Sequence, residues 1–448
     1  MLKKLIVLLF FISYSVQSQH FVKGTMNPTN EEFTWVALYQ LVGSKQIFIE
    51  NGTLENGMFS IELPENSSEG MYRLHYKMDN TRFVDFIFTN ENIELQFDPS
   101  KPSETIKFST SEENILYTNY LNQTNELKQQ LNSIQYSYFN LQTENEKNDA
   151  AKFYEIYFLK YVAVQEQFEE KSIGKLANHF IKASKKYYAQ HLIETPQVYL
   201  NSEKKHFFDF INFSDKTLIN STFITQNVLD YVFYLNVSED FEVQNILHKN
   251  AINEVLGKQT ENIKIKRDLI TTLLYAFAQN ENITIVDYIK ENYYNKLPNE
   301  YKTDVDIDTL LESLKLVVGR KAPDFSWEEN GTAKSLYELN SAETYMLVFW
   351  STSCSHCLNE VPELYEYTKD KTNIHVIDIA LENDSLEFEK YTKIFKKWSN
   401  VLGLGKWENN IARNYEIVST PTYFILDTNK TMIAKPEFIE DVKAFFKD

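Results

Sequence analysis

The order of hydrophobic and polar positions divides the 448-residue chain into segments of different character. From residue 19 to residue 108, apolar and polar residues alternate in short runs, which turn dipeptides such as Asn51-Gly52 and Asn56-Gly57 separate. Alternation with a period of two predicts strands, and Asn-Gly turns favour hairpins. We expect strands over residues 34–40, 45–49, 58–63, 71–76, 83–88 and 92–97. This segment is therefore predicted to form a small antiparallel β-sandwich or barrel-like domain.

From residue 109 to residue 317 the apolar positions follow a helical period instead. One apolar stripe at helical spacing consists of Tyr117, Tyr120, Leu127, Leu131, Ile134, Tyr138 and Leu141. Ser111, directly before two glutamates, is suited to cap the start of that helix. Glycine is nearly absent, with Gly174 and Gly257 as the exceptions. We expect an all-helical domain over residues 109–317.

Residues 318–448 alternate between strand and helix patterns. Strands are expected over residues 345–350, 374–380, 422–426 and 432–434. Helices are expected directly after Cys354 and over residues 386–397, 409–415 and 437–447, whereas residues 401–405 read as a glycine-containing connection. Alternation of this kind predicts an α/β domain with a mixed sheet and helices on both faces.

The first 18 residues have the pattern of a secretory signal peptide. Lys3 and Lys4 precede the apolar residues 5–12, and Ser18 ends a site of small residues suited to cleavage. The apolar run is shorter than the roughly 20 residues that span a membrane, and no cysteine follows it that could carry a lipid anchor. We therefore predict a soluble, exported protein, with an uncleaved N-terminal anchor as the alternative. The abundance of Asn, Lys, Ile, Tyr and Phe indicates the periplasm of a Gram-negative bacterium.

The net charge of the chain bears on whether it binds nucleic acid or anionic membranes. The chain has 63 acidic and 45 basic residues, which gives a net charge of −18. No basic cluster is visible in the sequence, so nucleic acid and anionic membrane surfaces are not expected partners.

The two cysteines of the chain, Cys354 and Cys357, carry the clearest chemical signal. They are two residues apart and follow a predicted buried strand, at the start of a predicted helix. The helix N-terminus favours a thiolate at Cys354, and Cys357 lies one turn further, where it can resolve a mixed disulfide. Half of a zinc site is one alternative, but such a site needs four ligands, and no second cysteine pair exists. A structural disulfide is another, although so short a loop constrains the unfolded chain little.

Two neighbouring residues are candidates for tuning the thiols. Glu360 lies three residues after Cys357, so that one helical turn can bring its carboxylate towards the thiols; a solvated helix glutamate is the alternative. His356 lies between the cysteines, where a cationic ring would stabilise the thiolate and favour an oxidising couple; an exposed spacer is the alternative.

The segments Gly319–Phe325, Phe349–Pro362 and Val418–Asp427 together resemble the TlpA/ResA-like branch of the thiol-disulfide oxidoreductases of thioredoxin fold. The resemblance covers residues 318–448. It implies that Cys354 is the nucleophile and Cys357 the resolving thiol, and that Glu360 handles protons during exchange. It also implies a cis bond before Pro421, beside the cysteines, so that Thr420 and Pro421 bind the substrate backbone.

The resemblance has further implications and one departure. Trp350 matches a family tryptophan that packs under the site, and residues 19–108 resemble a β-rich domain of unknown function that precedes thioredoxin domains in exported bacterial proteins. Thioredoxins carry a buried aspartate six residues before the first cysteine, but this chain has Val348 there. A general base must therefore come from elsewhere, with Glu360 as the leading candidate. Peroxide reduction is not expected, because the proline that peroxiredoxins require seven residues before the cysteine is replaced by Leu347.

These observations predict an exported thiol-disulfide oxidoreductase that needs neither cofactor nor metal. Its expected substrates are protein thiols and disulfides, and its expected electron source is an upstream donor in the membrane. A binding or scaffold protein with a thioredoxin module is the alternative. His356 favours an oxidant whereas the family resemblance favours a reductant, and we expect a reductant. The sequence leaves open the client proteins, the oligomeric state and the tasks of the first two domains.

Overall fold

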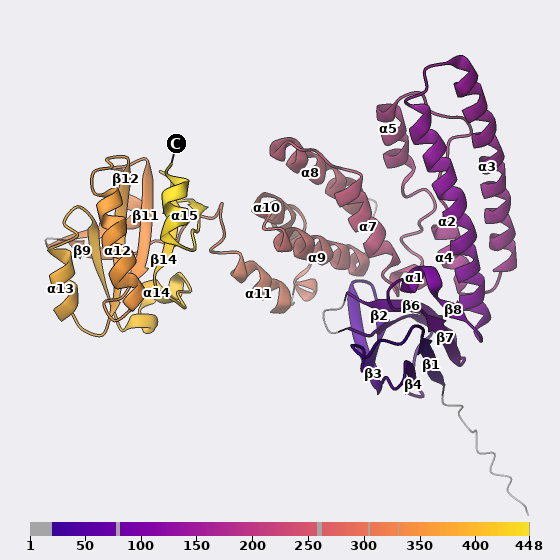
Figure 1. The fold of residues 1–448 in the computed structure, drawn as a ribbon, viewed down its shortest axis with the longest axis horizontal. Helices are drawn as coiled ribbons and strands as arrows, with labels where there is room; N and C mark the ends of the chain where they lie inside the picture. Colours follow the sequence, from indigo (N-terminus) through magenta and orange to yellow (C-terminus); the bar gives the residue numbers. More distant parts are fainter. Residues whose placement is uncertain (1–19, 78–80, 258–261, 303–304, 330, 448) are drawn as a thin grey trace, which may run out of the picture. The chain divides into compact units, whose positions relative to one another are not determined.

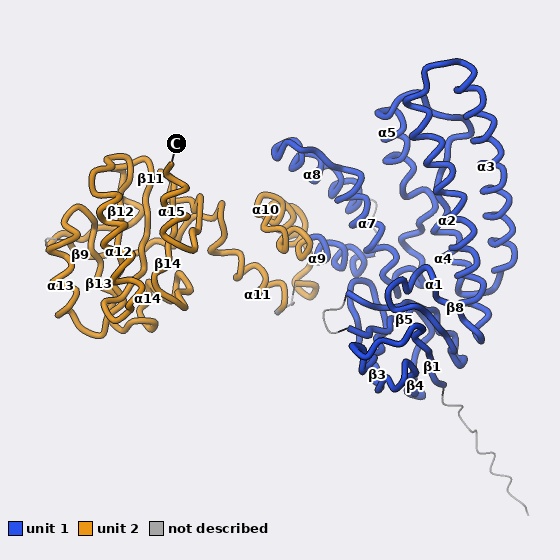
Figure 2. The backbone as a smooth tube through the Cα atoms, in the orientation of Figure 1, with its two compact units in different colours: residues 1–273 blue, residues 274–448 orange. Residues whose placement is uncertain are grey.

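The computed structural model describes residues 20–77, 81–257, 262–302, 305–329 and 331–447 (Figure 1). The chain forms two compact units, residues 1–273 and 274–448 (Figure 2). The predicted signal peptide, residues 1–18, lies outside the described residues. Within the described part of the chain, no helix combines the length and the apolar character needed to cross a membrane.

The first unit begins with two four-stranded sheets that share one core. The first sheet has the order β4-β1-β7-β8, with β1 Phe21–Met26, β4 Met58–Glu62, β7 Ile93–Phe97 and β8 Lys107–Phe108. The second has the order β3-β2-β5-β6, with β2 Trp35–Val42, β3 Lys45–Thr53, β5 Gly70–His75 and β6 Phe83–Phe88. Residues of both sheets, such as Val22 and Leu38, are buried in the shared core. The predicted β-rich domain is confirmed.

One strand pair differs from the antiparallel prediction. Strands β1 and β7 run parallel, whereas the other pairs in these two sheets, among the described residues, are antiparallel. Parallel neighbours need a long crossover, and residues 27–92, which include the whole second sheet, supply it. The prediction was wrong for this pair because alternation within a strand does not identify the strand's partner.

Helices follow the sandwich, as predicted. Helices α2 (Glu112–Tyr138) and α3 (Glu144–Lys171) pack against each other as a long hairpin (Figure 1). Ser111 caps α2 by accepting the backbone N–H of Asn114, and Leu141 lies beyond the end of the helix. The other helices described in this region are α4 Ala177–Ala183, α5 Pro196–His206, α6 Lys216–Ile219, α7 Phe223–Tyr234, α8 Phe241–Gly257 and α9 Ile263–Gln279, whereas the short helix α1 Pro102–Thr105 lies within the sandwich, between β7 and β8.

The boundary between the compact units falls inside α9, after Leu273. The second unit therefore includes residues 274–317, the last part of the helical domain predicted over residues 109–317. These residues form α10 Ile283–Asn292, α11 Val305–Ser313 and the short 3₁₀ helices η1 Tyr294–Lys296 and η2 Asn299–Tyr301. Arg320 joins them to the following segment, because its guanidinium donates to the Asp287 carboxylate at 2.6 Å and to the Leu314 carbonyl at 3.2 Å.

The C-terminal part of the second unit is built around a five-stranded mixed sheet of order β13-β12-β11-β14-β15. The strands are β11 Thr344–Trp350, β12 Ile374–Glu382, β13 Ser399–Leu404, β14 Thr422–Leu426 and β15 Met432–Ala434. Strands β11, β12 and β13 are parallel, and β14 and β15 pair antiparallel. The other elements are α12 Ser355–Thr368, α13 Leu386–Thr392, α14 Asn410–Asn414, α15 Ile439–Phe445, the hairpin β9 Ser326–Glu329 and β10 Thr332–Ser335, and the 3₁₀ helices η3 Leu336–Glu338 and η4 Lys406–Glu408.

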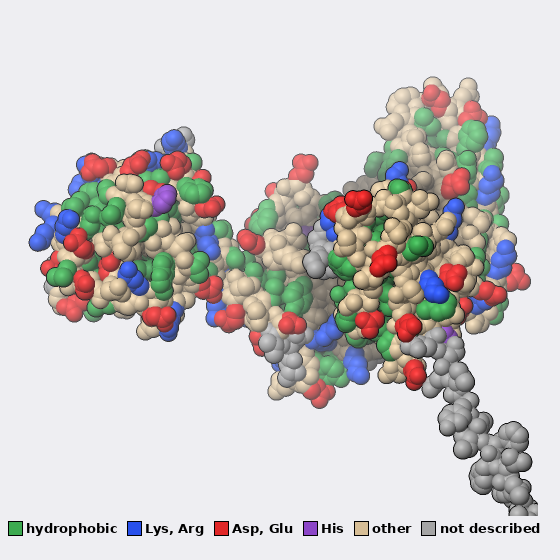
Figure 3. Space-filling view, turned by 60° about the horizontal axis from the view of Figure 1, so that its bottom comes forward, with side chains coloured by type: hydrophobic (Ala, Val, Ile, Leu, Met, Phe, Trp, Pro, Cys, Tyr) green, Lys and Arg blue, Asp and Glu red, His purple; other side chains and the backbone are tan. Residues whose placement is uncertain are grey.

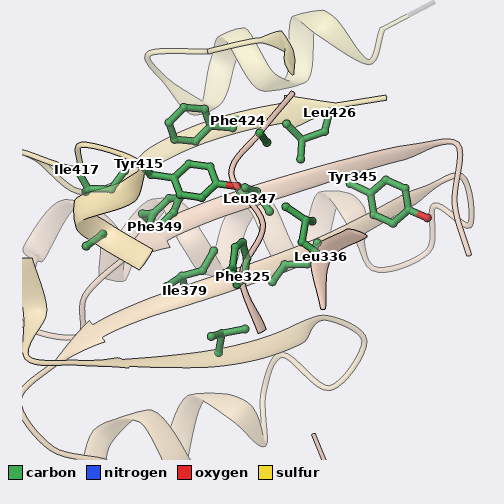
Figure 4. Close-up of a cluster of buried hydrophobic side chains, with 14 of the residues drawn as sticks. Phe325, Leu336, Tyr345, Leu347, Phe349, Ile379, Tyr415, Ile417, Phe424 and Leu426 are labelled. Atoms are coloured by element: carbon green, nitrogen blue, oxygen red, sulfur yellow. The ribbon is translucent and has the colours of Figure 1, made fainter. Parts of the chain in front are cut away.

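Each face of this sheet covers its own hydrophobic core. On one face, Phe349 packs with Tyr415 and Phe424, whose ring centroids lie 5.1 and 5.9 Å from its own (Figure 4). On the opposite face, the alternate residues of β11 pack against α12 and α15, and this second core contains Trp350 and Cys357. The predicted α/β architecture with helices on both faces is confirmed.

Strand β13 corrects one prediction. Residues 401–405 were expected to form a connection, but Ser399–Leu404 pairs in parallel with β12 at the edge of the sheet. A Cβ atom at Gly403 would lie 2.8 Å from the Leu381 side chain, so glycine here permits close strand approach rather than a turn. The predicted helix over residues 386–397 is also shorter, because α13 ends at Thr392.

Charged side chains are distributed over both units. On the face drawn in Figure 3, acidic and basic side chains are interspersed, with hydrophobic side chains between them. Many of the charged groups pair with one another, as Lys443 does with Glu363 in the C-terminal domain.

Candidate active site

The two cysteines lie where β11 passes into α12. Strand β11 is buried along nearly its whole length and ends at Trp350, and a short polar loop then leads to Cys354. Cys354 is the N-cap of α12, and its Sγ accepts the backbone N–H of Cys357 at 3.3 Å. Both cysteines are free thiols; Cys354 is partly exposed, whereas Cys357 is fully buried. Only the first thiol is therefore accessible to a substrate.

The two thiols also differ in pKa: the accessible thiol of Cys354 has the lower value and the buried thiol of Cys357 the higher. Partial burial acts to raise the pKa of Cys354, but the hydrogen bonds of this thiol, those with Cys357 foremost, together outweigh it and hold this pKa below its ordinary value. Burial raises the pKa of Cys357, and its contact with Cys354 adds to the effect. The geometry therefore favours a reactive thiolate at Cys354 and a protonated thiol at Cys357.

A backbone carbonyl of the segment before β14 reaches the accessible thiol. The Thr420 carbonyl oxygen lies 3.3 Å from Cys354 Sγ and accepts a hydrogen bond from it. The peptide bond between Thr420 and Pro421 is cis, as the family resemblance implied. The structure thus brings Thr420 and Pro421 beside the thiols, and their predicted role in substrate binding stays a prediction.

The side chain of Glu360 is 22% exposed, and its carboxylate contacts two side chains. Its Oε2 accepts the hydroxyl of Tyr423 at 3.0 Å, and its Oε1 lies 3.7 Å from His356 Nδ1. Tyr423 is buried on β14, and burial, the Glu360 carboxylate and nearby Cys357 all raise its pKa. Sequence analysis missed Tyr423, because a tyrosine in a strand reads as core. Its position two residues after Pro421 was the available signal.

The imidazole of His356 is exposed at the surface, as in the alternative given for it. Its side chain is 82% exposed, with Nδ1 3.7 Å from the Glu360 carboxylate, and its backbone N–H adds to the hydrogen bonds from Cys357 that lower the pKa of Cys354. The predicted redox-tuning role of the imidazole stays a prediction.

Trp350 contacts a buried carboxyl group that sequence analysis did not identify. Its indole Nε1 donates to Asp378 Oδ2 at 2.9 Å. Asp378 lies on β12, directly opposite Val348, and alternates with Val376 and Ala380 on the face that covers Cys357. Complete burial raises the pKa of Asp378 to about 7. A single acidic residue within the apolar run Ile374–Leu381 was the sequence signal for it.

Two further contacts hold the loop that precedes Cys354. The carboxylate of Glu382, at the end of β12, accepts the backbone N–H of Thr352. The ammonium group of Lys406 donates to Ser353 Oγ at 3.0 Å. Neither residue was a sequence candidate, since both lie far from the cysteines along the chain.

The described residues contain no group of three or more His, Cys, Asp or Glu side chains that could hold a metal ion. The site as described therefore consists of two thiols, a carboxylate, a phenol and a backbone carbonyl.

The C-terminal part of this chain is similar in sequence to known proteins. Residues 342–432 match the family model described as thioredoxin-like. The thioredoxin-like protein YneN of Bacillus subtilis is 26% identical over 110 residues, which are 24% of this chain. The match spans 65% of the length of that curated relative.

Solved structures of related domains are also similar. A domain of a possible thiol-disulfide isomerase from Cytophaga hutchinsonii is 32% identical and aligns over 29% of this chain and 90% of its own, with a TM-score of 0.26. The thioredoxin domain of a thiol-disulfide oxidoreductase from Bacteroides vulgatus is 25% identical over 30% of this chain and 99% of its own, with a TM-score of 0.26. With the family match and the order of the sheet, the C-terminal domain of this chain is a thioredoxin-like domain.

Proposed function

We propose that this chain is an exported thiol-disulfide oxidoreductase that reduces disulfides in other exported proteins. The observation that carries the proposal is the asymmetric pair of thiols at the start of α12. Cys354 is accessible and has a lowered pKa, and buried Cys357 donates its backbone N–H to the sulfur of Cys354. Such an arrangement suits one attacking thiolate and one resolving thiol.

The exchange proceeds in two steps. The Cys354 thiolate attacks one sulfur of a substrate disulfide, and the other substrate sulfur leaves as a thiolate and takes up a proton. Cys357 then loses its proton and attacks Cys354 Sγ, which releases the second substrate thiol. Two electrons pass to the substrate, and the protein ends with a Cys354–Cys357 disulfide. An upstream donor in the membrane would return it to the dithiol form, and no cofactor is needed.

Thr420 and Pro421 support the first step as substrate contacts. Thr420 lies within hydrogen-bonding distance of the attacking sulfur, so a client backbone that pairs with this segment would bring its disulfide to Cys354. The predicted signal peptide supports export to the periplasm, where protein disulfides persist.

A single-turnover assay tests the proposal. The reduced mature protein, residues 19–448, is mixed with insulin, and free thiols on both proteins are counted over time. We expect the protein to lose its two thiols as one insulin disulfide is reduced. If the protein keeps both thiols while insulin stays oxidised, the proposal is wrong.

Tyr423 offers a prediction about the second step. Its hydroxyl binds Glu360 and lies close enough to Cys357 for the two groups to interact. We expect the proton that Cys357 loses to pass to the Tyr423 oxygen while the Tyr423 hydroxyl proton passes to the Glu360 carboxylate. Tyr423→Phe should therefore slow resolution by about tenfold or more, while formation of the mixed disulfide changes little. Stopped-flow measurement of the two thiol releases between pH 6 and 9 separates the steps.

Tyr367→Phe is the matched control, because it removes another phenol of the same domain, whose hydroxyl binds the Lys443 carbonyl. The proton-transfer role is excluded if Tyr423→Phe and Tyr367→Phe give the same rate of resolution across this pH range.

A further inference from the structure

A short loop after β13 lies against the loop that carries Cys354. The backbone N–H of Gly405 donates to the Glu382 carbonyl at 2.9 Å, and the same residue, Glu382, holds Thr352 through its carboxylate. The ammonium group of Lys406 then reaches Ser353, the residue before Cys354. Gly405 and Lys406 are thus held beside the loop that carries Cys354 by contacts to Glu382 and Ser353.

Lys406 has a backbone conformation that is unfavourable for a residue with a side chain. Gly405 and Lys406 both have left-handed conformations, with φ of 90° and 50°. Glycine adopts this region freely, but a lysine does so at an energetic cost. Non-glycine residues in this region cluster at functional sites when the surrounding structure holds them there. The cost is explained if the position of the Lys406 side chain matters for function.

Charge and exposure around the loop point to one kind of partner. Among the described residues, Lys406 forms no ion pair and donates only to Ser353, and neighbouring Glu408 pairs with Arg413. The next residue, Trp407, is 44% exposed, and Val418, two residues before Thr420, is 90% exposed. In the part of the chain that the structure describes, a cation without an ion-pair partner thus contacts the loop that carries Cys354, and exposed apolar side chains lie next to it in the chain and two residues before Thr420.

We propose that residues Lys406 and Trp407 select client segments in which an acidic and a large apolar residue flank the disulfide-bonded cysteine. The ammonium group attracts the client carboxylate, and the indole packs against the apolar side chain. Lys406 contacts Ser353, the residue directly before Cys354, and the inference rests on the proposed oxidoreductase function. It identifies the substrate class of that site as extended, acidic and apolar polypeptide.

Three symmetric peptide disulfides test the proposal with the full mature protein. The cysteine is flanked by Glu and Phe in the first, by Lys and Phe in the second, and by Glu and Ser in the third. The readout is the ratio of kcat/KM between two peptides for each protein variant, so that a change common to all substrates cancels. We expect the wild-type protein to prefer the Glu-Phe peptide over the Lys-Phe peptide about five- to tenfold, less at high salt.

Substitutions at Lys406 and at Trp407 separate the preference for an acidic residue from the preference for an apolar one. Lys406→Gln should bring the Glu-to-Lys preference to about one through a change in KM, whereas Lys406→Arg should keep it. Trp407→Ala should remove the preference for Phe over Ser and leave the charge preference. Lys443→Gln, which removes a paired cation from the same domain, is the control.

The results distinguish failure of the inference from failure of the proposed function. Reduction of all three peptides at equal rates, or an unchanged charge preference in Lys406→Gln, overturns the inference alone. Failure to reduce any peptide, together with failure to reduce the small disulfide 2-hydroxyethyl disulfide, overturns the oxidoreductase function and the inference with it.

Discussion

Cys354→Ser is expected to reduce the rate of insulin reduction to that of the uncatalysed reaction, whereas Cys357→Ser is expected to accumulate protein covalently joined to its substrate. The two variants should differ because only the Cys354 thiol is accessible to a substrate. Cys354 is partly exposed and has a lowered pKa, so it supplies the attacking thiolate, while Cys357 is fully buried with a raised pKa. A buried thiol cannot replace the accessible one in the first step.

The Cys357→Ser variant retains that first step. A serine at position 357 keeps the backbone N–H that donates to Cys354 Sγ and can donate its own hydroxyl in place of the thiol. After attack on the substrate, no second thiol is present to release it, so the mixed disulfide persists. Mass spectrometry under non-reducing conditions should find the substrate attached to Cys354.

Serine at both positions is the control for adventitious adducts. An adduct in Cys354→Ser, or full turnover by either single variant, would show that the chemistry does not follow the order derived from burial and hydrogen bonding.

Asp378→Asn is expected to stabilise the C-terminal domain above pH 7 and to remove a dependence of its stability on pH. The carboxyl group has a pKa of about 7 in the folded protein, against the ordinary value of 3.8. Between these values the folded protein binds a proton that the unfolded chain has released, so the free energy of unfolding falls as pH rises. At about 1.4 kcal/mol for each pH unit, the loss is on the order of 4 kcal/mol between pH 4 and 7.

Asparagine has the same shape and can still accept the Trp350 indole N–H through its side-chain oxygen. It carries no charge, so the loss of stability with pH should disappear. Chemical denaturation followed by tryptophan fluorescence measures this domain, because four of the five tryptophans, Trp327, Trp350, Trp398 and Trp407, lie in it.

Asp370→Asn is the matched control in the same domain. That carboxylate is exposed and pairs with Lys397, so its replacement should change stability little at any pH. The account of Asp378 fails if Asp378→Asn destabilises the domain equally at pH 5 and pH 8, since a purely structural contact would be lost at both.

Local patterns made much of this molecule predictable. The apolar run Tyr345–Trp350 predicted the buried strand, and the CxxC motif directly after it predicted thiols at a helix N-terminus. Both are local features, since strand propensity and helix capping depend on a few neighbouring residues. The same reasoning located the strands Thr422–Leu426 and Met432–Ala434, whose bounds agree with the structure.

Features that depend on partners far apart in the chain were missed. The parallel pairing of β1 with β7 and the edge strand containing Gly403 are set by neighbouring strands rather than by their own patterns. Asp378 and Tyr423 join the site only because β12 and β14 flank β11 on either side. Lys406 likewise reaches Ser353 from more than 50 residues away.

The reduction potential of the Cys354–Cys357 couple tests the central claim most directly. The mature protein is equilibrated in dithiol and glutathione buffers of graded potential, and its free thiols are counted after quenching. The account predicts that both thiols are oxidised together in one two-electron step, with a midpoint potential of about −270 mV, as in a reductant of this fold. A couple near about −120 mV would contradict the direction of transfer, and two free thiols in the most oxidising buffer would contradict disulfide exchange itself.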